Sequence, residues 1–157
     1  MGYLCLTCFN EYRGEALKLD NPLYDGYHYR CPDKKCGDIN LVEIDDLILP
    51  IIKLLNMKGY MTVYCCSSHS YELKQRPNTY ISFKKECLPD IVPEGFVLED
   101  EKWCKENRYS NFDSKESICI RKNYNEDLDE YELHQEICKT MITLLDWAEE
   151  LEDMVIN

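Results

Sequence analysis

Cys5-Leu6-Thr7-Cys8 and Cys31-Pro32-Asp33-Lys34-Lys35-Cys36 are the two stretches that decide the fold of this chain. Two cysteines separated by two to four residues allow one short turn to direct both sulfurs at one ion, and zinc favours four thiolates in a tetrahedron. Gly37 follows the last cysteine and can adopt a positive φ, which lets backbone amides point at the thiolates. The sequence therefore predicts that Cys5, Cys8, Cys31 and Cys36 bind one structural Zn²⁺ ion.

The cysteine pairs divide the 157 residues into an N-terminal zinc ribbon over residues 1–40 and a second domain over residues 41–157. Between the pairs, Asn21-Pro22 and Asp25-Gly26 are turn signals that favour short β elements. His28 lies beside the second pair, but with four cysteines available we interpret it as a hairpin side chain rather than a zinc ligand. The length suits one compact domain with a small zinc-binding module.

The second domain is predicted to contain strands and two helices. Apolar residues at helical spacing indicate a helix over residues 43–58, in which Pro50 either introduces a kink or marks the true start. Strands are predicted over residues 60–66, 79–83, 96–99 and 117–121, and a loop with one helical turn near Trp103 over residues 100–114. A long amphipathic helix, capped by Asn125 or Asp127, is predicted over residues 128–154. The predicted class is α+β: a four-cysteine zinc ribbon followed by a small sheet of about four strands packed on two helices.

The net charge of −12 is concentrated at the end of the chain. Residues 126–157 contain eleven acidic residues and one basic residue, Lys139. Acids such as Glu149 and Glu150 oppose the helix dipole at the C-terminal end of the predicted helix. These carboxylates form either a solvated helix face or a docking face for a basic protein. The lack of a basic stripe argues against direct binding to duplex DNA.

The ten cysteines point to a reducing compartment. Four have the spacing of zinc ligands, and the N-terminus lacks the basic and apolar regions of a secretory signal. No run of about 18 apolar residues occurs, so no membrane-spanning segment is predicted. We therefore expect a cytoplasmic protein.

A second candidate site lies where the first strand of the second domain ends. Cys65-Cys66-Ser67-Ser68-His69-Ser70 combines thiols, hydroxyls and an imidazole. Cys66, Ser67, Ser68, His69 and Ser70 could cradle an anion such as a phosphate. The same residues could support catalysis by a cysteine nucleophile with a histidine base, or they could simply tie down a turn. No catalytic residue is assigned, because the sequence contains no Gly-rich nucleotide loop, serine elbow or paired-carboxylate motif.

The order of motifs resembles that of small uncharacterised proteins of low-GC Gram-positive bacteria (Firmicutes) and their phages. Those proteins have a GYxT strand, a Cys-Ser-Gly-His loop and a WAEEL-like end, matched here by Gly59-Tyr60-Met61-Thr62, Cys66-Ser67-Ser68-His69 and Trp147-Ala148-Glu149-Glu150-Leu151. The resemblance covers most of residues 40–153 and implies no activity. The loop is also similar to the Ser-Cys-Ser-Gly-Arg turn of wyosine-type tRNA modification enzymes, with Ser68 and His69 in the Gly and Arg positions.

The favoured hypothesis is a non-enzymatic, zinc-stabilised binding or regulatory protein of phage or mobile-element origin. Its acidic helix, from residue 127 to 153, would engage or inhibit a basic protein that handles nucleic acids. The alternative is a nucleotide- or RNA-directed enzyme or ligand receptor that uses the Cys65–Ser70 loop. In a third hypothesis the zinc ribbon contacts nucleic acid through a small group of cations: Arg13, Lys18, Arg30, Lys34 and Lys35.

Overall fold

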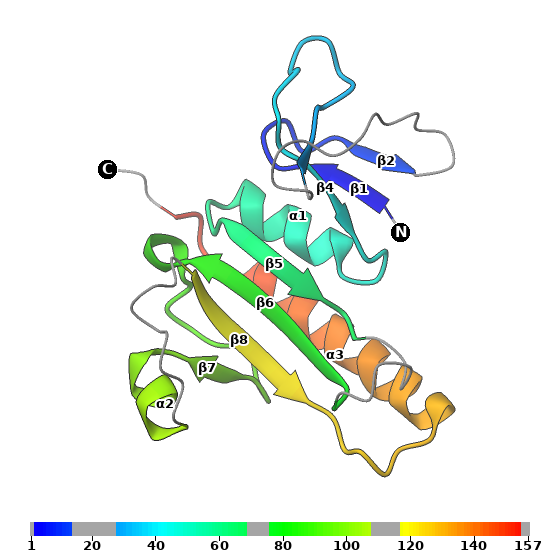
Figure 1. Cartoon of the computed structure of the whole chain (residues 1–157), viewed down its shortest axis with the longest axis vertical. Coiled ribbons are helices and arrows are strands. Elements are labelled where there is room, and N and C mark those ends of the chain that lie inside the picture. Colours follow the sequence, from blue (N-terminus) through cyan, green and yellow to red (C-terminus); the bar gives the residue numbers. More distant parts are fainter. Residues whose placement is uncertain (1, 14–27, 69–75, 108–116, 155–157) are drawn as a thin grey trace.

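Two antiparallel sheets of four strands each form the framework of the molecule (Figure 1). The computed structural model describes residues 2–13, 28–68, 76–107 and 117–154. The first sheet, ordered β2-β1-β4-β3, consists of β1 (Gly2–Cys5), β2 (Glu11–Arg13), β3 (His28–Tyr29) and β4 (Leu41–Ile44). The second, ordered β5-β6-β8-β7, consists of β5 (Thr62–Cys66), β6 (Asn78–Lys84), β7 (Val97–Glu99) and β8 (Ser117–Asn123). The α-helices among the described residues are α1 (Leu49–Met57), α2 (Glu101–Glu106) and α3 (Glu130–Glu150), so the predicted α+β class is confirmed.

The first sheet, with the turns that it carries, is called the N-terminal module here and comprises residues 2–13 and 28–44. Its strand β4 begins just beyond residue 40 and pairs with both β1 and β3. Of the two roles that the sequence left open for Pro50, the second is confirmed, because the helix begins at Leu49 and Pro50 lies in its first turn. The missing amide hydrogen of proline costs no helical hydrogen bond at that position. Residues 43 and 44, which the predicted helix included, belong instead to β4, where Ile44 is held in register with Gly2 of β1.

The second sheet has the strands that the sequence indicated, with ends that differ by one or two residues. Alternate residues of the central strand β6 point to the core, and Thr79, Ile81 and Phe83 are completely buried. Ile81 faces Ile120 of β8 and Cys65 of β5, so one apolar row crosses three strands. Helix α2 occupies the position of the single predicted helical turn.

Helix α3 runs behind the second sheet, while α1 lies beside β5, between that sheet and the N-terminal module (Figure 1). Both helices and the sheet share one hydrophobic core. Leu4 of β1 and Ile44 of β4 belong to the same core as Ile52 of α1. The module is therefore packed on the rest of the protein through buried side chains.

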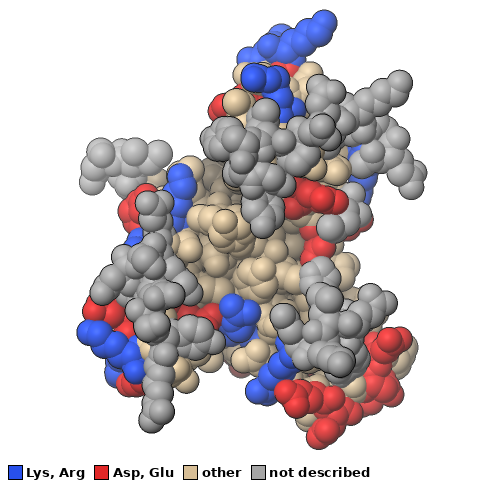
Figure 2. Space-filling model, in the orientation of Figure 1, with Lys and Arg blue, Asp and Glu red and all other residues tan. Residues whose placement is uncertain are grey.

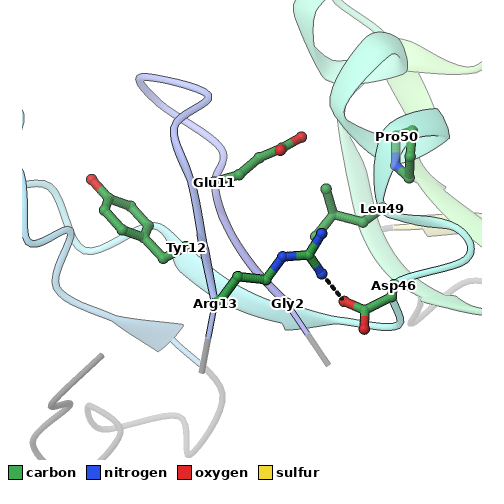
Figure 3. A pocket seen from close by; sticks show the side chains of 7 residues that line it. All are labelled: Gly2, Glu11, Tyr12, Arg13, Asp46, Leu49 and Pro50. Carbon is green, nitrogen blue, oxygen red and sulfur yellow. Dashed lines mark hydrogen bonds and ion pairs between the residues drawn. The ribbon is translucent and has the colours of Figure 1, made fainter. Parts of the chain in front are cut away.

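The outer side of this junction is polar. Arg13 Nη1 lies 2.9 Å from Asp46 Oδ1, and Lys53 Nζ lies 3.4 Å from Glu11 Oε1. Figure 3 shows Arg13, Asp46 and Glu11 around a pocket of about 180 Å³ that also borders Leu49. A Cβ atom on Gly2 would lie 2.7 Å from Leu49 Cδ1, so a larger residue there would require the Leu49 side chain to move.

Helix α3 begins with a reciprocal capping arrangement. Asp129 accepts a hydrogen bond of 2.7 Å from the Glu132 amide, and the Glu132 side chain accepts one of 3.3 Å from the Asp129 amide. The prediction of Asn125 or Asp127 as the cap was wrong, because Asn125 instead accepts a bond from the Asp127 amide in the turn before the helix. In the described part of the chain, no helix has the length and apolar character needed to cross a membrane.

A lysine that directly follows another helix, α1, binds the C-terminal end of α3. Lys58, directly after α1, donates hydrogen bonds of 2.9, 2.8 and 2.5 Å to the carbonyl oxygens of Ala148, Glu149 and Leu151. The Lys58 carbonyl in turn accepts a bond of 2.8 Å from the Met154 amide. The ammonium group satisfies carbonyls that the helix leaves unbonded and supplies positive charge at the negative end of its dipole.

Candidate metal centre

Two turns of similar geometry carry the four cysteines of the N-terminal module. Cys5 ends β1 and Cys8 follows it, while Cys31 and Cys36 follow β3. Within each turn the residue after the second cysteine has a positive φ, 63° at Phe9 and 58° at Gly37. Gly37 was predicted to adopt this conformation, whereas nothing in the spacing signalled it for the bulky Phe9.

Backbone hydrogen bonds close both turns. The Cys5 amide donates to the Asn10 carbonyl over 3.1 Å, and the Cys31 amide donates to the Asp38 carbonyl over 2.8 Å. Because β1 and β3 both pair with β4, the two turns emerge at the same end of the sheet. The fold thus brings together two segments that are distant in the sequence.

The four predicted ligands lie together. Cys5 Sγ is 3.8 Å from Cys36 Sγ, and Cys8 Sγ is 3.7 Å from Cys31 Sγ. All four sulfurs lie within 4.8 Å of one another, and Cys5 and Cys31 are buried. Cys5, Cys8, Cys31 and Cys36 are therefore placed to hold a metal ion.

Electrostatics explain why this cluster suits a cation. Burial raises the pKa of the Cys5 thiol to about 12, and burial also raises the pKa of Cys8. At Cys31 burial acts in the same direction, but hydrogen bonds from the Asp33 amide and the Tyr12 hydroxyl outweigh it and lower the pKa. A bound cation would stabilise all four thiolates together. Tyr12, whose hydroxyl lies 3.7 Å from Cys31 Sγ, was missed by sequence reasoning.

The other polar residues noted near the cysteines have different roles. His28 pairs with Val42 in the sheet and is not part of the metal-ligating cluster found among the described residues. Arg30 donates a hydrogen bond of 2.8 Å to the Gly37 carbonyl, and Arg13 is ion-paired with Asp46. Lys18 lies outside the described residues. Arg30 thus supports the module itself, and Arg13 joins it to the turn before α1.

The second candidate site is described as far as Ser68; His69 and Ser70 lie outside the described residues. Cys66 and Ser67 are buried. Ser67 Oγ donates a hydrogen bond of 3.1 Å to Asp45, and the Ser67 carbonyl accepts one of 2.8 Å from Thr79. These bonds fix the end of β5 against β6 and the turn before α1, which favours the structural interpretation of this loop. No local pattern signals the Asp45 contact.

Ser68 has an unusual backbone conformation. Its φ is 114°, in a region that glycine adopts readily and other residues rarely do. The end of this described segment therefore has a backbone conformation that glycine adopts more readily than serine.

The thiols beside this turn have raised pKa values. Burial, reinforced by the negative charge of Asp45, raises the pKa of Cys65 to about 12. Burial is also the main cause that raises the pKa of Cys66. A raised thiol pKa lowers the thiolate fraction near neutral pH, which is the opposite of what a cysteine nucleophile needs.

Alkylation kinetics should show this directly. At pH 7.5 we expect iodoacetamide to modify Cys65 and Cys66 at least about a hundredfold more slowly in the folded chain than in urea, because the neutral, buried thiol is a poor nucleophile. Peptide mapping by mass spectrometry gives the rate at each cysteine. Fast modification of Cys66 in the folded protein would revive the catalytic interpretation of the loop.

Comparisons with known proteins add no relative. A scan of protein-family models finds no match, and neither does a search of curated proteins or one of solved structures. The function is therefore inferred from the geometry and charge of this chain alone.

Proposed function

We propose that this chain is a non-enzymatic, zinc-stabilised binding protein whose acidic C-terminal surface engages a basic protein that handles nucleic acids. The geometry of the four cysteines supports the zinc ion in this proposal. Tetrahedral zinc with Zn–S distances of about 2.3 Å places its sulfurs about 3.8 Å apart. Two of the six separations in the cluster, 3.7 and 3.8 Å, match that edge length, and all six are within 4.8 Å. Four thiolates complete the shell, so the ion would have a structural role and no open position for a substrate.

The acidic surface is the observation that supports the binding role. All but one of the eleven acidic residues between positions 126 and 157 are exposed, and the remaining one, Glu136, is half-buried. The exposed acids flank the ends of α3: Glu126, Asp127, Asp129, Glu130 and Glu132 at the start, and Asp146, Glu149, Glu150, Glu152 and Asp153 at the end. Figure 2 shows acidic side chains gathered at the lower right, over the segment between β8 and α3 and the first turns of that helix.

The rigidity of α3 makes this surface suitable for docking. A helix of 21 residues is about 30 Å long, and here it is capped at both ends and packed on the core. The two groups of carboxylates at its ends are therefore held a fixed distance apart, and each presents negative charge as the phosphates of a nucleic acid do. A protein channel that binds DNA or RNA with lysine and arginine would attract such a surface electrostatically.

Charge reversal tests this proposal. In one variant Glu126, Glu130, Asp146 and Glu150 are changed to lysine; in the matched control Glu86, Asp90, Glu94 and Glu106 are changed instead. All eight positions are exposed, so both proteins should fold, and both undergo the same change in net charge. We expect the α3 variant to lose on the order of tenfold or more in affinity for partners captured from the host, because close charge pairs become repulsive.

The captured complex should also respond to a competitor and to salt. A short DNA duplex should displace the wild-type protein from its partner if both occupy the same basic channel, and raising the salt concentration should weaken the complex. Quantitative mass spectrometry of the captured proteins measures both effects. Equal binding by the α3 variant and the control would exclude the acidic surface as the docking face.

A further inference from the structure

A second pair of metal-ligating side chains lies on the solvent-facing side of α3. Cys138 Sγ is 3.6 Å from His134 Nε2, one helical turn away. His134 is exposed and Cys138 is half-buried. Both positions lie within the helix, whose opposite face is fixed in the core by Leu133 and Ile137. The backbone that carries this pair is therefore rigid.

The separation of the two atoms fits a shared metal ion. Zinc at about 2.3 Å from a thiolate and about 2.0–2.1 Å from an imidazole, with a tetrahedral angle between them, separates sulfur from nitrogen by about 3.6 Å. That value is the distance observed between Cys138 and His134. Thiolate and imidazole are also the ligands that zinc prefers. The pair supplies two of the four ligands, and the other two must come from elsewhere.

The apolar side chains around His134 and Cys138 suggest that a second copy of this chain supplies the other two ligands. Tyr131, Cys138 and Leu145 follow one another at intervals of seven residues, with Ile142 between the last two, so all four lie along one side of α3. Tyr131 and Ile142 are 71% and 63% exposed. A two-fold axis through the shared ion passes between His134 and Cys138, so it would place Tyr131 of one antiparallel copy beside Ile142 of the other.

Charge determines how such copies could associate. Residues 126–157 carry ten more negative than positive charges, so two α3 helices repel each other in the absence of a cation. One Zn²⁺ ion bound by two thiolates and two neutral imidazoles forms a site of zero net charge. The four bonds between zinc and its ligands would offset the repulsion between the two helices. The exposed Tyr131 and Ile142 side chains would also become buried between them.

We propose that His134 and Cys138 form half of a second zinc site, which the same pair from a second copy of this chain completes. The site has two thiolate and two imidazole ligands, and binding releases the thiol protons to solvent as the two thiolates coordinate the ion. Association of two copies therefore depends on zinc and on both side chains.

Native mass spectrometry and sedimentation velocity test this proposal on the full chain, titrated with zinc in the presence of a phosphine reductant that prevents disulfides. We expect a dimer that holds one ion in each N-terminal module and one shared ion. His134→Ala and Cys138→Ser should each remain monomeric with one ion per chain, and their melting temperatures in the monomeric state should match that of the wild type. Gln135→Ala, on the same side of the helix, is the matched control and should still form the dimer.

Three results would overturn the proposal. The wild type could remain a monomer with one ion, which would exclude the second site. It could remain a monomer with two ions, which would exclude the shared ligand set. Finally, His134→Ala could dimerise as well as the wild type, which would exclude the histidine as a ligand.

Discussion

Replacing Cys31 with alanine is expected to abolish stable metal binding at the four-cysteine cluster and to unfold the N-terminal module. Cys31 is only 4% exposed, and its sulfur lies within the cluster of four. Structural zinc sites contribute about 10–16 kcal/mol of apparent binding energy in small zinc-binding peptides, which exceeds the stability of many complete domains. Cobalt absorption of the substituted protein measures the thiolate site, and hydrogen exchange of the β1 and β4 amides measures folding of the module.

Cys138→Ser is the control for this experiment, because it removes a thiol that lies outside the cluster. It should retain the cobalt–thiolate absorption of the four-cysteine cluster, at one ion per chain, and the protected amides of the N-terminal module. The loss in Cys31→Ala should extend beyond the module, since Leu4 and Ile44 share the core of α1. Unchanged metal content and unchanged amide protection in Cys31→Ala would show that the cluster is not a structural metal site.

Replacing Lys58 with methionine is expected to lower the free energy of unfolding by about 3 kcal/mol, because the ammonium group donates to three carbonyls at the end of α3. Methionine retains the apolar stem but removes that group. A hydrogen bond to a charged group contributes about 1.5–3 kcal/mol, and the partial exposure of Lys58 keeps the total well below three times that value. Urea unfolding followed by circular dichroism gives the change directly.

Lys53→Met is the matched control on the same helix. Lys53 Nζ makes one ion pair of 3.4 Å with Glu11 at the surface, and such pairs contribute about 0–1 kcal/mol. We therefore expect Lys53→Met to be several times less destabilising than Lys58→Met. Equal effects of the two substitutions would mean that capping of α3 by Lys58 adds little to stability.

The parts of this fold that local patterns determine could be predicted. The cysteine spacing indicates which sulfurs one turn can direct at one ion, and the structure brings those four together. The alternation of inward- and outward-facing residues along β6 and the helical spacing of apolar residues along α3 likewise depend on neighbours within a few residues. Gly37 could be predicted because the conformation after a second cysteine favours glycine.

The parts that depend on distant segments could not be predicted. Leu41 and Ile44 have the apolar spacing of a helix, and only pairing with β1 makes them a strand. Lys58 caps a helix that ends about ninety residues further along the chain, and Asp45, before α1, anchors Ser67 at the end of β5. The contact of Tyr12 with Cys31 could not be predicted either, because no local pattern marks a hydroxyl that faces the sulfur of a cysteine in another segment.

The position of β1 has a consequence for synthesis on the ribosome. This strand is made before its neighbours, yet it lies in the interior of its sheet and is bonded to β2 on one side and β4 on the other. Its second neighbour does not exist until Ile44 has been translated and has left the exit tunnel. Because the two cysteine pairs lie at the ends of β1 and β3, and both strands pair with β4, the four sulfurs come together only after β4 has emerged from the ribosome.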